Sequence, residues 1–252
     1  MMKIAYDGSG FSGWQRQPDK RTVQGTLEEA LSVFTGTEIK LNGTSRTDAG
    51  VNALMQCASF KGEFSIPPEG LMRAANNLLS GGLNRKNPVG DVRILSLEEV
   101  ALDFHARFDC KGKTYRYIIN NGEPDIFRRN YCYWVPQKLE LKRMQEAAGI
   151  LKGTHDFRAF QSSGGNERET TVRTISDIRV FRDEEHPSDI VTEVTGDGFL
   201  YNMVRIIIGT LTETGLGKRD PSDMERVINS LDRSEAGHTA PAEGLYLKEI
   251  YF

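Results

Sequence analysis

The sequence predicts a mixed α/β or α+β architecture built from two similar halves. Strand-like and helix-like segments alternate along the 252 residues, which is typical of mixed folds. Two successive sets of strand, helix, strands and helix meet near residues 103–113. No Pro/Gly/Ser-rich linker and no low-complexity segment separates them. A fused pair of subdomains that share a continuous sheet explains this pattern better than two independent domains.

The first half begins with strand-like residues and then predicts two helices. Residues 22–34 form an amphipathic pattern, because apolar side chains recur at helical spacing. A loop bounded by glycines follows at residues 43–50. The apolar segment 53–60 then leads to a second helix near residues 68–79.

The second half predicts strands that alternate with three helices. Residues 114–120 read as a strand with Tyr115, Tyr117 and Ile119 on one face. The other expected elements are a helix at 141–151, antiparallel strands at 176–181 and 190–195, a long helix after the turn at 196–198, a helix opened by Pro221 and a final strand at 245–251.

Composition excludes several classes of protein. With 38% hydrophobic and 27% charged residues, the chain is of the ordinary soluble globular type. Cys57, Cys110 and Cys132 are odd in number and widely spaced, which fits neither a disulfide framework nor a CxxC site. No apolar run approaches the roughly 20 residues of a membrane helix, and no signal-peptide pattern opens the chain. A reducing, cytoplasmic setting without a membrane is therefore expected.

The net charge of −3 counts mildly against a nucleic-acid partner, since such binders usually carry a positive excess. The sum hides local clusters, however. Basic residues gather in two places: Arg107, Lys111, Lys113 and Arg116, and then Arg168, Arg173, Arg179 and Arg182. Solvated faces and RNA-binding patches both fit this distribution, so charge decides nothing by itself.

The loop from Gly43 to Gly50 is the first candidate for chemistry. Glycine at both ends allows sharp turns. Arg46 and Asp48 lie two positions apart, so an extended backbone points them to the same side. Asp48 can be a cap of the following segment or a catalytic carboxylate, and the spacing alone leaves both interpretations open.

Arg205 is the second candidate, because it lies in the nearly apolar segment 199–209. A helix that is apolar all round is usually buried. A guanidinium there needs a carboxylate or a phosphate, unless its long side chain reaches water. Asp48 is a plausible partner, and an arginine at contact distance would keep that carboxylate ionised.

At this point the motifs resemble those of the TruA-type tRNA pseudouridine synthases. Residues 43–51, Gly-Thr-Ser-Arg-Thr-Asp-Ala-Gly-Val, are similar to the RTDxGV signature of that family. Further similar motifs follow in family order at residues 6–17, 103–108, 115–117, 199–209 and 243–247. Short motifs are weak evidence singly, whereas several in order over most of the chain are specific.

The resemblance implies an α+β fold of two fused ferredoxin-like subdomains around a continuous, mainly antiparallel sheet. The expected subdomains are residues 1–105, with the Asp48 loop, and residues 106–252, with the active-site cleft between them. The implied activity converts uridine to pseudouridine in the anticodon stem-loop of tRNA, at tRNA positions 38, 39 or 40. The implied assembly is a homodimer with one tRNA lying across both subunits.

The resemblance also implies residue roles. Asp48 matches the essential aspartate, and Arg46 matches an arginine that helps the target base leave the stack. Tyr115 matches a tyrosine that packs on that base, Arg205 matches the arginine that pairs with the aspartate, and Leu245 matches an apolar residue near the base. Base flipping costs a few kcal/mol, which these contacts would partly offset. The carboxylate can act as nucleophile at C1′ or as base at C2′.

Four more residues are candidate RNA contacts: Trp14, Arg16, Asn52 and Arg107. Trp14 can stack on RNA or pack against a strand. Asn52 stands where the family commonly has His, and can bond a phosphate or the backbone; Ser45 stands where Gly is common. We expect these departures to alter target choice rather than the reaction.

Neither a cofactor nor a metal is expected, because the isomerisation needs no redox change or external reagent. His105 and His155 also lack ligand-like spacing with other His or Cys. Two rival functions remain open. The chain can be a non-catalytic tRNA-binding or tRNA-folding protein on the same scaffold, or, more distantly, a glycosidase that uses Asp48 with a second carboxylate.

Overall fold

The computed structural model describes residues 1–81, 89–164 and 170–252. The chain divides into two compact units, Met1–Lys111 with Tyr246–Phe252, and Gly112–Leu245. This differs from the division expected at residue 105 in two respects. The first unit extends to Lys111, and it also takes the end of the chain, because Tyr246 pairs with Asn52 of a first-unit strand.

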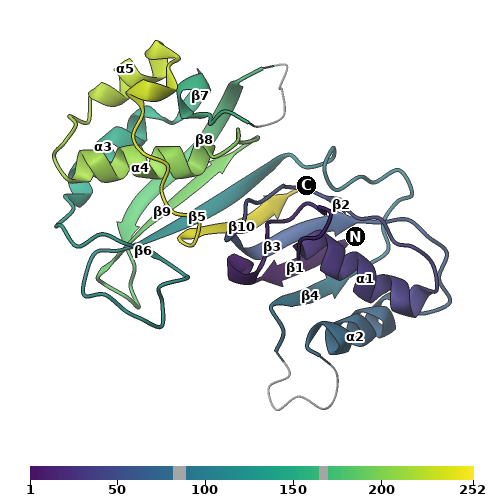
Figure 1. Ribbon diagram of the computed structural model, residues 1–252. Coiled ribbons are helices and arrows are strands. Elements are labelled where there is room, and N and C mark those ends of the chain that lie inside the picture. Colours follow the sequence, from purple (N-terminus) through teal and green to yellow (C-terminus); the bar gives the residue numbers. More distant parts are fainter. Residues whose placement is uncertain (82–88, 165–169) are drawn as a thin grey trace. The chain divides into compact units, whose positions relative to one another are not determined.

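The first unit contains a sheet whose strand order is β4-β1-β3-β10, with β2 beside β3 (Figure 1). Its strands are β1 Met2–Tyr6, β2 Asn42–Gly43, β3 Asn52–Ser59, β4 Val92–Leu97 and β10 Leu245–Tyr251. Strand β1 pairs antiparallel with both β3 and β4, whereas β10 pairs parallel with β3. Along β1, buried Met2, Ile4 and Tyr6 alternate with half-buried residues, as a strand with one covered face requires.

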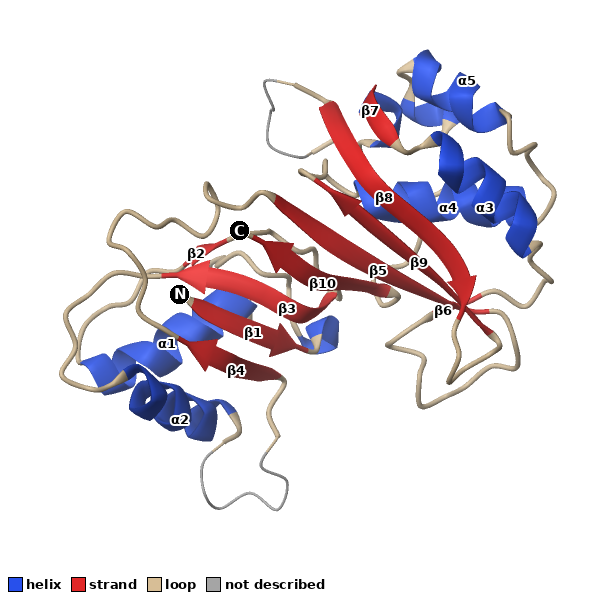
Figure 2. Ribbon diagram, turned by 180° about the vertical axis from the view of Figure 1, so that it is seen from behind, coloured by secondary structure: helices blue, strands red, loops and turns tan. Residues whose placement is uncertain are grey.

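Two helices cover one face of this sheet (Figure 2). They are α1 Val23–Thr35 and α2 Pro68–Leu79, and a short 3-10 helix, η1, spans Gly8–Gly10. Both α-helices lie where the sequence predicts them. Helix α1 begins at Thr22, whose hydroxyl accepts a hydrogen bond from the Gly25 N–H, and its Leu27 and Leu31 side chains are fully buried.

The second unit contains an antiparallel sheet in the order β5-β9-β8-β7, with β6 parallel to β5. Its strands are β5 Gly112–Asn120, β6 Tyr133–Trp134, β7 Gly153–Asp156, β8 Val172–Arg182 and β9 Asp189–Gly196. The α-helices are α3 Leu141–Ile150, α4 Met203–Gly215 and α5 Asp223–Ser230, with 3-10 helices η2 Arg158–Phe160 and η3 Arg233–Glu235. Tyr115, Tyr117 and Ile119 are all buried on β5, which confirms their predicted common face.

The α+β class with mainly antiparallel pairing is confirmed, while two predicted element starts are wrong: strand β8 begins at Val172 rather than at residue 176, and helix α5 begins later than expected. Helix α5 starts at Asp223 rather than Pro221, because Pro221 lies in the preceding turn, where its carbonyl accepts a hydrogen bond from Met224. Among the residues that the structure describes, no helix combines the length and apolarity needed to cross a membrane.

Candidate active site

The loop that carries Asp48 connects β2 to β3 within the first unit. Its residues alternate in exposure: Ser45 and Thr47 are buried, Arg46 is exposed and Asp48 is half-buried. Arg46 and Asp48 therefore share the outward side of the loop, as their spacing predicts. Exposed Arg46 and half-buried Asp48 carry the ionisable side chains of the loop, while buried Ser45 and Thr47 anchor its backbone.

Gln56 on β3 holds the inner side of this loop. Its Nε2 donates to the Ser45 carbonyl at 2.7 Å, and its Oε1 accepts from the Ser45 N–H at 3.4 Å and the Cys57 N–H at 3.1 Å. The Gln56 side chain is fully buried, so these bonds are closed to water. Losing them would leave buried peptide groups unsatisfied, which costs about 1–3 kcal/mol for each group. Gln56 therefore fixes the loop three residues before Asp48.

The glycine-rich N-terminal motif at residues 6–17 holds the other side of the Asp48 loop. Gly13 has a φ of +88°, and a Cβ added there would lie 2.7 Å from the Thr47 carbonyl oxygen. The backbone N–H of Trp14 donates to the same oxygen at 3.0 Å. Only glycine permits both this backbone conformation and this close approach. Sequence reasoning missed this role, although the spacing of Gly8, Gly10 and Gly13 was the available signal.

Two further contacts complete the clamp. The Tyr6 hydroxyl and Thr47 Oγ1 lie 2.8 Å apart in a buried hydrogen bond. Beyond Asp48 the backbone turns at Gly50, whose φ is +79°, and the Val51 N–H donates to the Asp48 carbonyl at 3.2 Å. The backbone on both sides of Asp48 is thus fixed before any ligand arrives, which is what a reacting carboxylate requires.

Asn52 and Trp14 are parts of this scaffold. Asn52 is 2% exposed, and its Oδ1 accepts a hydrogen bond from the Gly8 N–H at 2.8 Å, so the backbone-bonding alternative describes it. Trp14 is also 2% exposed, and a Cβ added to Gly43 would lie 2.5 Å from its ring. Burial leaves the indole no free face for a base. The structure therefore supports the packing interpretation of Trp14.

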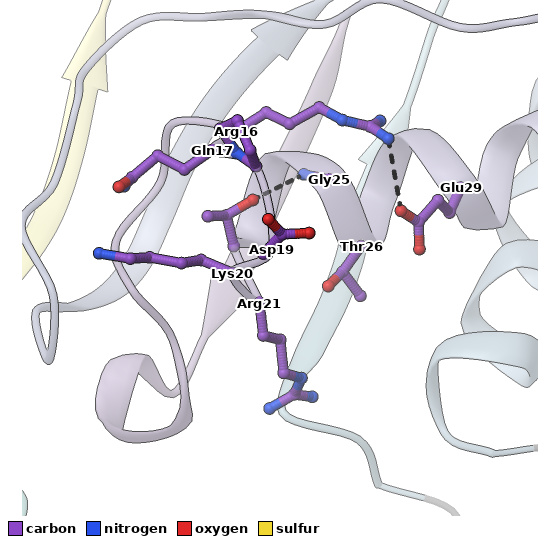
Figure 3. A pocket seen from close by; sticks show the side chains of 10 residues that line it. Arg16, Gln17, Asp19, Lys20, Arg21, Gly25, Thr26 and Glu29 are labelled. Carbon is purple, nitrogen blue, oxygen red and sulfur yellow. Dashed lines mark hydrogen bonds and ion pairs between the residues drawn. The ribbon is translucent and has the colours of Figure 1, made fainter.

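Arg16 lines a pocket of about 750 Å³ at the start of α1 (Figure 3). Its guanidinium bonds Glu28 at 3.1 Å and Glu29 at 3.6 Å. Figure 3 shows Arg16 reaching towards Glu29 across the helix start, while Lys20 and Arg21 extend elsewhere. Asp48 does not line this pocket, and the carboxylates beside Arg16 offset its charge. The pocket is therefore separate from the candidate chemistry.

Tyr115 lies on β5 in the second unit and is 7% exposed. Its ring meets Phe199 edge-on, with centroids 5.2 Å apart and an interplanar angle of 88°. In the antiparallel register Tyr115 is opposite Val194 of β9. This geometry is consistent with both roles open to Tyr115: a core residue that packs across strands, or an aromatic ring on which a base packs.

Arg205 lies in the first turn of α4, and its guanidinium donates to one backbone carbonyl and one side-chain amide oxygen. Its Nε donates to the Ala240 carbonyl at 2.7 Å, and its Nη1 donates to Asn202 Oδ1 at 2.9 Å. The Ala240 N–H returns a bond to the Arg205 carbonyl at 3.0 Å. The guanidinium of this half-buried residue thus has neutral hydrogen-bond partners within its own unit.

Tyr117 fixes the same connection from the sheet side. Its hydroxyl donates to the Pro241 carbonyl at 2.8 Å, and burial, reinforced by Glu243, raises its pKa well above the ordinary value despite Arg205. A Cβ added to Gly244 would lie 2.7 Å from the Tyr117 ring. These contacts fix the segment that leads into Leu245.

Leu245, the predicted apolar neighbour of the target base, is 6% exposed at the start of β10. Its N–H donates to the Ala242 carbonyl at 2.9 Å, which closes a turn just before the strand. The other predicted site residues Tyr115 and Arg205 belong to the same unit as Leu245. The predicted pairing of Asp48 with Arg205 and the predicted cleft involve residues of different units, and both stay predictions.

One arginine from each basic cluster, Arg116 from the first and Arg179 from the second, neutralises a buried acid. Glu193 on β9 is 4% exposed, and Arg116 donates to its Oε1 through Nε at 2.9 Å and Nη2 at 2.7 Å. Arg179 donates to Oε2 at 2.8 Å. Two arginines on one buried carboxylate leave the trio with a single net positive charge. Arg168 of the second cluster lies outside the described residues.

No cluster of three or more His, Cys, Asp or Glu side chains is arranged to hold a metal within residues 1–81, 89–164 and 170–252. Burial raises the pKa of the Cys57 thiol to about 11, with Lys3 opposing the shift. Burial likewise raises the pKa of Cys132. Both thiols are therefore protonated at neutral pH, which makes them poor metal ligands and poor nucleophiles.

Comparison with known proteins adds an independent finding. A family model described as tRNA pseudouridine synthase matches residues 2–109 and 147–252. The chain is 48% identical over 255 residues to tRNA pseudouridine synthase A 2 of Clostridium tetani, covering 100% of this chain and 97% of that protein. It is 46% identical over 250 residues to tRNA pseudouridine synthase A of Acetivibrio thermocellus, covering 99% of this chain and 97% of that protein.

Proposed function

We propose, because the chain belongs to the tRNA pseudouridine synthase family, that it isomerises uridine to pseudouridine in tRNA. In this reaction the N1–C1′ bond of uridine breaks and a C5–C1′ bond forms. C5 releases a proton and N1 takes one up, so the composition of the nucleotide is unchanged. The target that we propose is the anticodon stem-loop, at tRNA positions 38, 39 or 40.

One observation carries the assignment of Asp48 as the catalytic carboxylate. Asp48 is half-buried on a loop that Gln56 holds on one side and Gly13 and Trp14 hold on the other. A group that attacks C1′, or takes the C2′ proton, must be held close to one ribose carbon. A clamped backbone supports that role because it reduces the entropy lost on reaching the reactive geometry.

The supporting residues have separate proposed roles. Arg46, exposed on the same side of the loop as Asp48, would fill the space that the flipped uridine leaves in the stem. Tyr115 would pack on the flipped base and Leu245 would lie near it. Arg205 would favour the ionised form of Asp48.

The proposal extends to partners and place of action. tRNA is the substrate, and a homodimer would pool the local basic faces of a chain whose net charge is only −3. The cytoplasm is the proposed location, because tRNA is the substrate. Sedimentation velocity of the purified chain tests the dimer, and a monomer at all concentrations would contradict it.

The decisive experiment maps pseudouridine in tRNA from cells that lack this protein, and then adds back wild type or Asp48→Ala. We expect wild type to restore pseudouridine, and Asp48→Ala to fold and bind tRNA without restoring it. Glu63→Ala, which removes an exposed carboxylate elsewhere in the same unit, is the matched control and should restore it fully. A non-catalytic tRNA-binding protein would instead give binding without product for every variant, including wild type.

A further inference from the structure

The turn at residues 105–109 presents an aromatic ring beside a cation. The Phe108 side chain is 75% exposed, and the guanidinium carbon of Arg107 lies 5.8 Å from the centre of its ring. The His105 ring lies on the Phe108 ring, with centroids 4.3 Å apart and planes tilted by 37°. An exposed Phe gains nothing from burial, so its ring is available to another molecule.

The backbone of this turn is fixed. The N–H groups of Phe108 and Asp109 both donate to the His105 carbonyl at 3.0 Å. The Asp109 carboxylate accepts from the His105 N–H at 2.7 Å, and His105 Nδ1 accepts from the Arg107 N–H at 3.1 Å. A ring on a fixed turn loses little conformational freedom on binding, and the Asp109 carboxylate is already engaged by the His105 N–H.

The same turn is bonded to the loop of Asp48. Ala106 is fully buried, its N–H donates to Ser59 Oγ at 3.1 Å, and its carbonyl lies 3.0 Å from the Thr44 hydroxyl. Thr44 belongs to the catalytic loop, where its N–H donates to the Cys57 carbonyl at 2.9 Å. The Phe108 ring is therefore held by the first-unit framework that also holds Asp48.

We propose that Phe108 and Arg107 form a stacking platform for an unstacked tRNA nucleotide, distinct from the uridine that reacts. The ring takes the face of the base, and the guanidinium takes the adjoining phosphate. Aromatic faces and arginine are the groups with which proteins hold splayed nucleotides. Exposed Arg46 and Lys111 in the same unit add positive charge suited to RNA. The platform rests on the proposed function, since it assumes a tRNA substrate.

The test compares Phe108→Ala, Phe108→Tyr and Phe127→Ala in the full-length chain. The dissociation constant for a tRNA transcript is measured by fluorescence anisotropy, and single-turnover pseudouridine formation is measured at saturating tRNA. We expect Phe108→Ala to weaken binding about tenfold, as the loss of one stacked base does, with a saturated rate within about twofold of wild type. Phe108→Tyr keeps the ring and should bind like wild type.

Phe127→Ala is the matched control, because Phe127 is 83% exposed and has no arginine over its ring in the described part of the chain. It should leave tRNA affinity unchanged. Phe108→Trp gives a second measurement, in which added tRNA should quench the new indole fluorescence beyond any change seen in wild type.

Several results would overturn the platform. They are a Phe108→Ala affinity within about twofold of wild type, an equal loss in Phe127→Ala, or no added quenching in Phe108→Trp. A shift of Phe108→Ala to monomer in sedimentation velocity, with unchanged tRNA affinity, would assign the surface to a second copy of the chain instead. A wild-type chain that binds tRNA but forms no pseudouridine would contradict the proposed function, and the binding comparison would still decide the platform.

Discussion

The substitution Gln56→Glu tests whether the Asp48 loop depends on its buried clamp. The change is isosteric, and one carboxyl oxygen can still accept from the Ser45 and Cys57 N–H groups. The other oxygen would face the Ser45 carbonyl, which accepts from Gln56 Nε2 at 2.7 Å in wild type. Two oxygens at that distance require a proton between them, so the carboxyl that the variant carries at position 56 must be protonated in the folded state.

The magnitude follows from the ordinary glutamate pKa of about 4.3. Holding the proton costs about 1 kcal/mol at pH 5 and up to about 4 kcal/mol at pH 7, at 1.36 kcal/mol for each pH unit. The folded-state pKa of the new carboxyl is raised, so the variant is close to wild type below pH 4 and loses stability as pH rises. The neutral amide of Gln56 carries no such dependence.

Urea unfolding at pH 5 and pH 7, followed by tryptophan fluorescence, measures the difference. Trp14 is buried beside the loop at Gly43, so its part of the signal, next to that of Trp134 in the second unit, changes when the first unit unfolds. Gln137→Glu, at an exposed position, is the control and should stay within about 0.5 kcal/mol of wild type at both pH values. An equal destabilisation of Gln56→Glu at pH 5 and pH 7 would refute the reasoning.

Three further predictions concern other parts of the chain. Gly13→Ala should lower the free energy of unfolding by at least about 2 kcal/mol and remove most of the activity, because a Cβ would meet the Thr47 carbonyl oxygen at 2.7 Å. Gly36→Ala, where φ is +67° but the space is open, should lower it by about 1 kcal/mol and keep activity. Equal losses for the two variants in unfolding and activity assays would contradict this. Burial raises the pKa of Cys57 from 9.0 to about 11, so as pH rises the unfolded chain loses the thiol proton before the folded chain does. The free energy of unfolding should therefore fall by up to about 1.4 kcal/mol for each pH unit between pH 9 and 11. Urea titrations that give the same free energy of unfolding across this range would contradict the prediction. Arg205→Ala should lower both activity and stability, since it removes donors to Ala240 and Asn202, and full turnover with an unchanged melting temperature would show that neither contact matters.

Much of the candidate site was readable from the sequence because its signals are local. Glycines at 43 and 50 predict a turning loop, and the two-residue spacing predicts that Arg46 and Asp48 face the same way. The observed alternation of exposure along residues 45–48 agrees with that spacing. Helical periodicity likewise predicted α1, whose apolar residues recur every three or four positions.

Other residues escaped prediction because their roles depend on partners far along the chain. Gln56 reads as one more polar residue in a strand, and its clamp on Ser45 appears only when β3 lies beside the loop. Trp14 had two interpretations until burial against Gly43 selected one. The ends of β10 were predicted, yet its membership of the first unit was not, since its parallel pairing with β3 joins residues about 190 positions apart.

The sequence by itself determined the α+β class, the positions of the main helices and strands, and the loop on which Asp48 lies. It could do so because periodicity, glycine placement and short motifs act over a few residues. Only the tertiary structure decided which groups hold that loop, that two arginines serve buried Glu193, and that the ring of Phe108 stays exposed on a turn bonded to Thr44. Burial and hydrogen-bond partnership are properties of residues brought together by folding, and the order of amino acids along the chain does not state them.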